Sequence, residues 1–315
     1  MIQIVRYDSL MVTRWDEFVK NSSNGTFLHM RGYMDYHSDR FSDCSLLAFD
    51  DKQRLVAILP ANLSGTILYS HQGLTYGGWI VGRRHFASSV MLEVWEAAVE
   101  WMRANGIKEL IYKAIPHIYH RYPAEDDLYA LFRLGAQIEA CQVSSAIALR
   151  SQWLPNESAK QQIKAAKNGG VIIRRSDDYA SFMEMLSQRL DERYSVSPVH
   201  TLSEMELLAK RFPRNINLYM AYSSEGEPLA GTIVYKTDTV VHTQYIATTE
   251  LGRNNHVFSA VVDYLLENEC EGRDWLDFGV SCEQGGLVLN EGLNRQKYGL
   301  GGRPIVYTAY RLKIS

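Results

Sequence analysis

The feature that most constrains the fold is an order of expected elements that occurs twice along the chain. Apolar runs and turn residues predict the order β-α-α-β-β-β-α-β-α-β in each half. Matching strands begin at Leu55 and Leu229, and again at Glu109 and Trp275, so the offset is about 170 residues, one domain length. A strand meander joined to a crossover helix requires a mixed sheet with helices on both faces. The sequence therefore predicts an α/β protein (α+β, mixed sheet) made of two similar units.

The length and composition agree with two folded units. The chain has 315 residues, 46% hydrophobic and 22% charged, which is typical of a soluble protein with real cores. We expect an N-terminal unit over 1–150, a linking helix over 151–170 and a C-terminal unit over 171–315. The net charge of -3 provides no general attraction for nucleic acids.

The cysteines and the N-terminal segment predict a cytoplasmic protein. The four cysteines are far apart and form no CxxC motif, so we expect reduced thiols and no metal site. The segment Met1–Tyr7 lacks the charged-then-apolar pattern of a signal peptide. No apolar run is long enough to span a bilayer.

The stretch from Asp274 to Gly299 raises a chemical question. A short apolar strand over 275–280 is followed by Gly285-Gly286 and by a helix expected over 287–298. Helical spacing places Lys297 on the apolar side of that helix. An inward lysine must lose its charge, pair with a carboxylate or meet a ligand. Lys297 is thus either a functional group or the partner of Asp277 or Glu283 in a structural ion pair.

A second unusual stretch lies in the first half, where one strand is expected from Thr66 to about Ile80. Its segment 69–79 is rich in glycine, aromatic residues and hydrogen-bonding groups, unlike a simple exposed strand. His71, Tyr76 and Trp79 suit an acceptor groove in which a sugar or peptide stacks and hydrogen-bonds. The alternative is a bulged strand that packs against the other unit.

Polar and aromatic residues also follow the strand expected over 109–115. His117 and His120 are three residues apart, but nearby prolines prevent a helix from presenting both to a metal. We therefore predict substrate contact for these two histidines. A basic run that includes Lys160, Lys164 and Lys167 either faces tRNA or forms a solvated surface.

The element order resembles the GNAT acyltransferase fold, and two copies in one chain resemble the Fem-type peptidoglycan aminoacyltransferases and bacterial proteins described as acetyltransferases. The resemblance is carried by three main segments, Lys164–Val171, Leu276–Ser281 and Asn294–Gly299, together with His117–Asp127. It implies that the C-terminal unit holds the donor and that the N-terminal unit lies on the acceptor side. The long heptad arm that some Fem-type proteins insert is absent from this sequence.

The resemblance also implies roles for individual residues. Lys297 is expected in the acyl-donor site with Tyr298 as a neighbouring wall. Apart from the resemblance, the place of Asp277 on the strand 275–280 allows it either to accept a proton or to cap the next turn. Other GNAT proteins hold the coenzyme A pyrophosphate at a glycine-rich turn, which here is Leu251–His256 with one glycine. The residues expected to bind the donor there are Arg253, Asn254 and Asn255. Ser281, at the C-terminal end of the strand 275–280, is expected either to bind the donor as well or to be a plain turn residue.

The sequence thus predicts an enzyme that moves an acyl or aminoacyl group to an amine, such as a small molecule or a peptidoglycan precursor. The donor, acyl-CoA or aminoacyl-tRNA, acts as a co-substrate, and no tightly bound cofactor is expected. The alternative is a non-catalytic ligand-binding protein that has kept the fold, because fold alone does not establish function.

Overall fold

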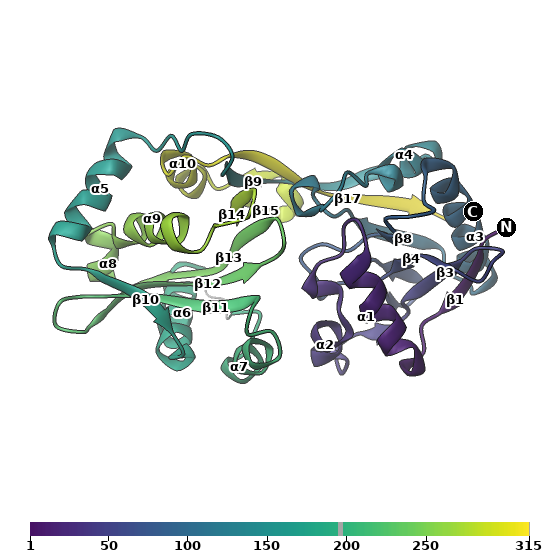
Figure 1. The fold of residues 1–315 in the computed structure, drawn as a ribbon, viewed down its shortest axis with the longest axis horizontal. Helices are drawn as coiled ribbons and strands as arrows, with labels where there is room; N and C mark the ends of the chain where they lie inside the picture. The colour runs from purple at the N-terminus through teal and green to yellow at the C-terminus, as the bar shows by residue number, and fades with distance from the viewer. Residues whose placement is uncertain (195–197, 315) are drawn as a thin grey trace. The chain divides into compact units, whose positions relative to one another are not determined.

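The computed structural model describes residues 1–194 and 198–314, which form two compact units. The first unit comprises Met1–Val143, Cys282–Val288 and Val306–Ser315, and the second comprises Ser144–Ser281 and Leu289–Ile305. Figure 1 shows the helices and strands of each unit. No helix in the described residues combines the length and apolar character needed to cross a membrane.

The first unit contains two sheets, in the orders β1-β3-β4-β7 and β9-β17-β8-β6-β5-β2. Its helix α3 covers a core that includes Trp79 and Trp95, both essentially inaccessible to solvent. The strands and their bounds are β1 (Gln3–Arg6), β2 (Ser42–Asp43), β3 (Leu46–Phe49), β4 (Leu55–Leu59), β5 (Asn62–Ser64), β6 (Ile67–Tyr69), β7 (Ile80–Val81), β8 (Glu109–Lys113), β9 (Gln137–Ala148) and β17 (Arg303–Lys313). The helices are η1 (Ser9–Met11), α1 (Val12–Asn21), η2 (Phe27–His29), α2 (Arg31–Met34), η3 (Asp35–His37), α3 (Ser88–Ala104), η4 (His117–Tyr119) and α4 (Asp126–Arg133).

The second unit is one mixed sheet in the order β10-β11-β12-β13-β14-β9, with helices on both faces. Figure 1 shows α5 and α9 on one face and α6 and α7 on the other. The strands are β10 (Ile172–Ser176), β11 (Ile216–Tyr222), β12 (Pro228–Lys236), β13 (Val240–Thr248) and β14 (Trp275–Val280). The helices are α5 (Glu157–Asn168), α6 (Tyr179–Tyr194), α7 (Leu202–Arg211), α8 (Glu250–Asn254), α9 (Val257–Asn268) and α10 (Glu291–Gly299). The short segments before α10 are β15 (Cys282–Glu283), η5 (Gln284–Gly286) and β16 (Val288–Leu289).

The strands β13 and β14 are parallel neighbours only at their beginnings. The paired residues run from Val240 opposite Trp275 to His242 opposite Asp277, and the ladder stops there. In the same region β13 carries a bulge, because Tyr245 lies opposite Ile233 and Thr243 opposite Val234, leaving Gln244 as an extra residue. The sheet of the second unit therefore opens between β13 and β14 beyond His242 and Asp277.

Each unit receives a strand from the other half of the chain. Residues 144–148 of β9 pair with β14 in the second unit, whereas residues 309–313 of β17 pair with β8 in the first. This arrangement differs from the expected division at 150/151, which assigned the whole final strand to the C-terminal unit. Apolar periodicity predicts that a segment is a strand, but it does not identify the strand beside which it lies.

Two expected elements are wrong in their extent. The strand expected from Thr66 to Ile80 is interrupted, because only β6 and β7 at its ends are strands. His71 has a φ of 64°, and a Cβ at Gly77 would lie 2.0 Å from the carbonyl oxygen of Ser70, so the chain folds tightly on itself. The helix expected over 287–298 begins later, at Glu291, where the side chain of Asn290 accepts a hydrogen bond from the Leu293 amide.

Candidate functional site

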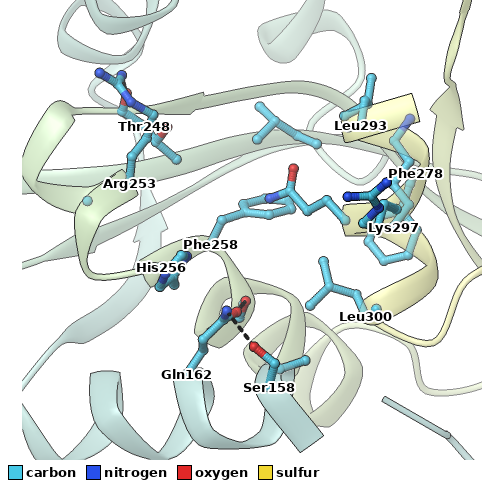
Figure 2. Close-up of a pocket in the computed structure, with 18 of the residues that line it drawn as sticks. Ser158, Gln162, Thr248, Arg253, His256, Phe258, Phe278, Leu293, Lys297 and Leu300 are labelled. Carbon is cyan, nitrogen blue, oxygen red and sulfur yellow. Dashed lines mark hydrogen bonds between the residues drawn. The ribbon is translucent and has the colours of Figure 1, made fainter. Parts of the chain in front are cut away.

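The second unit encloses a cavity of about 590 Å³. Figure 2 shows Arg253 and Thr248 on one side of it and Lys297 with Phe278 on the other. The lining residues come from α5, α6, β13, α8, α9, β14 and α10 and the turns beside them: Asn156, Ser158, Ala159, Gln162, Leu186, Arg189, Leu190, Ile246, Thr248, Gly252, Arg253, His256, Phe258, Ser259, Phe278, Gly292, Leu293, Arg295, Gln296, Lys297, Gly299 and Leu300.

The cavity lies where the sheet is open. It is lined by Leu186 from α6 and by Phe258 from α9, which cover opposite faces of the sheet. The cavity is also lined by Ile246 of β13 and Phe278 of β14, which follow the last residues paired between these two strands. An elongated ligand can therefore enter from the helical layers and reach the point at which the two strands separate.

The charges that line the cavity have one sign. Four cationic side chains, Arg189, Arg253, Arg295 and Lys297, contribute to it. The described lining residues include no aspartate or glutamate. Arginine and lysine are the side chains that bind phosphate groups most readily. The lining therefore favours an anionic ligand.

Lys297 lies on the inward side of α10, as its helical spacing predicts. It is 4% exposed, and its Nζ donates hydrogen bonds to the carbonyl oxygens of Gly279 and Val280, each at 2.8 Å. These carbonyls belong to the end of β14, beyond its pairing with β13. The lysine thus holds the separated part of β14 against α10.

Asp277 is fully buried at the last position of β14 that pairs with β13. Its Oδ1 accepts hydrogen bonds from the Ser144 hydroxyl at 2.6 Å and the Gly279 amide at 3.1 Å. Its Oδ2 lies 2.8 Å from Nδ1 of His242, the residue opposite on β13. The carboxylate therefore connects three segments of the second unit at the point where the sheet opens.

The turn after β13 differs from a glycine-rich phosphate loop. Thr249 caps α8 by accepting a hydrogen bond from the Gly252 amide, and His256 adopts a left-handed conformation between α8 and α9. A Cβ at Gly252 would lie 1.9 Å from the carbonyl oxygen of Leu229. The single glycine is therefore required for the close approach of α8 to β12.

Replacing Gly252 with alanine is expected to destabilise the second unit by roughly 1–3 kcal/mol, because the added methyl group must displace backbone of β12. Gly292→Ala is the matched control, since the nearest atom to its new Cβ is 3.9 Å away and the residue also lines the cavity. The thermal midpoints of both variants should be compared with that of the parent. Equal midpoints for all three would contradict this role of Gly252.

The other residues predicted to bind the donor lie beside the cavity rather than among its lining. Asn254 and Asn255 are exposed at the end of α8, and the Asn255 side chain donates to the Leu251 carbonyl at 2.9 Å. Tyr298 is 37% exposed and lies beside the Arg303 guanidinium, 5.8 Å from its ring centre. Ser281 is buried, and its hydroxyl has no hydrogen-bond partner among the described residues.

Three of the predicted substrate-binding residues are buried in the first unit. His71 stacks on His37 with ring centres 5.1 Å apart, and burial, aided by the charge of His37, lowers its pKa to about 3. Tyr76 is 2% exposed, and its hydroxyl donates to Thr26 at 3.4 Å. Trp79 is inaccessible and packs edge-to-face on Trp95. A contact between Trp79 and a substrate would therefore require the core to open.

The two remaining histidines are in different environments. His117 is exposed at the start of η4. His120 hydrogen-bonds through Nε2 to the Ile115 carbonyl at 3.0 Å, and burial lowers its pKa to about 4. Of the five predicted substrate-binding residues, His117 is the one whose side chain lies at the surface in this structure.

The sequence pattern missed several residues of the site. His242 reads as an ordinary strand residue, and its partnership with Asp277 depends on the parallel pairing of β13 with β14. Arg189 follows Leu186 by three positions on α6, which indicates a helix face but not the cavity beside it. Both residues become recognisable only when the strands and helices are placed together.

Comparison with known proteins agrees with this architecture. Residues 156–285 match the family model described as "Acetyltransferase (GNAT) domain". No curated protein sequence matches the chain. The family match covers α5 to η5 and therefore includes β13, β14 and the turn over 251–256 between them.

Solved structures show a similar fold over nearly the whole chain. The crystal structure of FemX aligns with a TM-score of 0.71 at 12% identity, covering 99% of this chain and 97% of that one. L-PGS from Bacillus licheniformis aligns with a TM-score of 0.60 at 11% identity, covering 96% and 90%. A tandem GNAT protein from the clavulanic acid biosynthesis pathway aligns with a TM-score of 0.56 at 13% identity, covering 100% and 99%. The predicted fold class, two tandem GNAT-like units in a mixed α/β structure, is confirmed.

Proposed function

We propose that this chain, which has the tandem GNAT fold and an acetyltransferase (GNAT) domain at residues 156–285, is an N-acyltransferase. It transfers an acyl group from acyl-CoA to an amine, and the donor occupies the cavity of the second unit. The observation that carries the proposal is a cavity lined by four cations that ends where β13 and β14 separate.

The electrostatics of the cavity suit the phosphate groups of coenzyme A. Arg253 follows the first turn of α8, and its guanidinium donates to the Thr248 carbonyl at 3.3 Å, so its side chain is held beside the cavity. Arg189 and Arg295 add two cationic groups. Because a phosphate needs charge-assisted donors rather than one particular backbone loop, these side chains compensate for the missing glycines.

The opening of the sheet suits the thioester end of the donor. A narrow pantetheine arm placed between Ile246 and Phe278 would bring its acyl carbonyl close to the bulge at Gln244. There an amine can attack the carbonyl carbon, which forms the amide bond and releases the thiol. Transfer of this kind requires mainly positioning, removal of a proton from the amine and stabilisation of the oxyanion.

Acetyl-CoA is expected to raise the thermal midpoint of the parent chain, because a ligand that binds only the folded state stabilises it by about 2.7 kcal/mol at one hundred times its Kd. Arg253→Ala should reduce the shift by removing a cation from the cavity lining. Arg150→Ala is the matched control, since this arginine of the second unit is 82% exposed and does not line the cavity.

The same experiment separates the proposal from its alternatives. It should include free coenzyme A and a longer acyl-CoA, and transfer should be followed as release of free thiol in the presence of amines. Binding without thiol release would favour a non-catalytic binding protein. The absence of any shift would contradict acyl-CoA as the donor and favour an aminoacyl-tRNA.

A further inference from the structure

The buried pair formed by His242 and Asp277 has the geometry of a base and the group that orients it. Nδ1 of His242 lies 2.8 Å from Oδ2 of Asp277. The other oxygen of the carboxylate already accepts from the Ser144 hydroxyl and the Gly279 amide. Asp277 is therefore fixed in position by two further donors that come from different strands.

This arrangement selects one tautomer of the imidazole. With Asp277 ionised, its carboxylate only accepts hydrogen bonds, and Nδ1 carries the proton that it donates to Asp277. In the neutral ring the lone pair that can take up a proton is then on Nε2.

The pair lies at the point where β13 and β14 separate. His242 and Asp277 are the last residues paired between the two strands. Leu276 and Phe278 belong to the apolar cluster beneath α9, so alternation along β14 directs Asp277 to the opposite face. The dyad therefore lies on the face that α6 covers, where Leu186 of α6 lines the cavity, whereas Phe278, the residue after Asp277, lines it from the other face.

Gly279 connects this dyad to Lys297. Its amide donates to Asp277 at 3.1 Å, and its carbonyl accepts from Lys297 at 2.8 Å. Gly279 has a φ of 76°, and a Cβ there would lie 3.2 Å from Cε1 of His242. The backbone thus passes directly beside the imidazole, and a side chain at this position would crowd it.

We infer that His242 is the general base of the transfer and that Asp277 is its positioning residue, an inference that rests on the proposed function. As the amine nitrogen bonds to the thioester carbon, Nε2 takes the proton that the nitrogen loses. The tetrahedral intermediate then expels the thiolate with its electron pair, and the imidazolium returns the proton to sulfur. The imidazole ends neutral, so the step balances with donor and amine alone.

The decisive variant is His242→Asn, because the new side-chain amide nitrogen can occupy the place of Nδ1 and still donate to Asp277, while nothing replaces Nε2. A purely structural histidine would tolerate this change. A general base would not, and kcat is expected to fall by about 10²–10⁴-fold with the KM for acetyl-CoA little changed. Asp277→Asn should also lower kcat, because its amide group favours the wrong tautomer.

The probes are acetyl-CoA with either methylamine or hydroxylamine as the acceptor. These amines are similar in size and both attack in their neutral form, but the nitrogen that has bonded to the carbon is less acidic with methylamine than with hydroxylamine and so depends more on a base to take its proton. The loss of kcat in His242→Asn should therefore be large with methylamine and much smaller with hydroxylamine. The tautomer is read separately from the ¹⁵N NMR signals of His242, which should show a proton on Nδ1 in the parent and on Nε2 in Asp277→Asn.

The outcomes separate this inference from the function on which it rests. If the parent transfers acetyl groups but His242→Asn is equally active with methylamine, or if the parent carries the proton on Nε2, the inference alone is overturned. If the parent transfers to neither amine, the proposed function fails and the inference fails with it. A selective loss with methylamine together with the Nδ1 tautomer supports both.

Discussion

Replacing Lys297 with methionine is expected to destabilise the second unit by roughly 2–4 kcal/mol, because two partly buried carbonyls lose a buried donor at a cost of about 1–3 kcal/mol each. Methionine fills most of the same space, so packing changes little. Gly279 would no longer be held in place, and Asp277, which accepts from its amide, would be less well fixed. Acetyl transfer should therefore fall together with stability.

A second variant separates the structural role of Lys297 from its charge. Lys297→Gln keeps an N–H donor but removes the positive charge from the cavity lining. We expect it to recover much of the unfolding free energy and yet to raise the Kd for acetyl-CoA. Urea unfolding and titration calorimetry measure the two effects. Equal affinity for acetyl-CoA in Lys297→Gln and the parent would show that the charge does not serve the donor.

Asp127→Asn is expected to change how the stability of the first unit depends on pH. Asp127 is buried in the first turn of α4, where it accepts hydrogen bonds from the Tyr112 hydroxyl and, at 2.9 Å, from the Leu128 amide. Burial raises its pKa from 3.8 to about 7. The folded state therefore keeps a proton that the unfolded chain has released over the range from about pH 4 to 7.

The direction in which the stability of the first unit changes with pH follows from how many protons each state binds. Because the folded state binds more protons in this range, stability falls as pH rises, and the loss is complete above about pH 7. The full effect is roughly 2–4 kcal/mol. An asparagine side chain does not titrate and carries no such dependence, so the variant should gain stability relative to the parent between about pH 4.5 and 8.

Denaturant unfolding at these two pH values, followed by tryptophan fluorescence, tests this expectation. Trp95 lies beside Tyr112, with ring centres 5.4 Å apart, and therefore reports on this part of the first unit. The comparison of two pH values cancels the change in the hydrogen bond with Tyr112, which the variant makes at both. Glu125→Gln changes an exposed neighbour and should stay within about 0.5 kcal/mol of the parent at each pH. A parallel pH dependence in Asp127→Asn and the parent would contradict the raised pKa.

Local patterns in the sequence predicted much of the second unit. The strand 275–280 and the inward side of Lys297 follow from apolar runs and helical spacing, which depend on neighbours in the chain. The segment 66–80 was misjudged because its apolar and aromatic residues favour a strand, whereas in the structure Gly73 packs against the side chain of His37 and Gly77 against the backbone of Ser70. Such contacts involve residues that periodicity does not bring together.

The residues of the candidate site were likewise predicted only where they follow from local sequence patterns. Lys297 and Arg253 were predicted from short motifs, and both line the cavity. The arginines of α6 and α10 and the dyad partner His242 were not predicted, because they join the site through helix packing and parallel strand pairing. Trp79 was chosen for its aromatic character, which suits a core as well as a binding groove.

The exchange of strands between the two units has a consequence for synthesis on the ribosome. The first unit includes residues 306–313 of β17, of which 309–313 pair with β8, although most of its other residues precede position 144. One edge of β8 therefore stays unpaired until β17 is translated, which happens only after nearly the whole second unit. During that interval its unpaired edge is open to pairing with other chains, which exposes the nascent chain to aggregation at this strand. A cut at residue 150 would make that exposure permanent, since it would leave each fragment with a strand that belongs to the other.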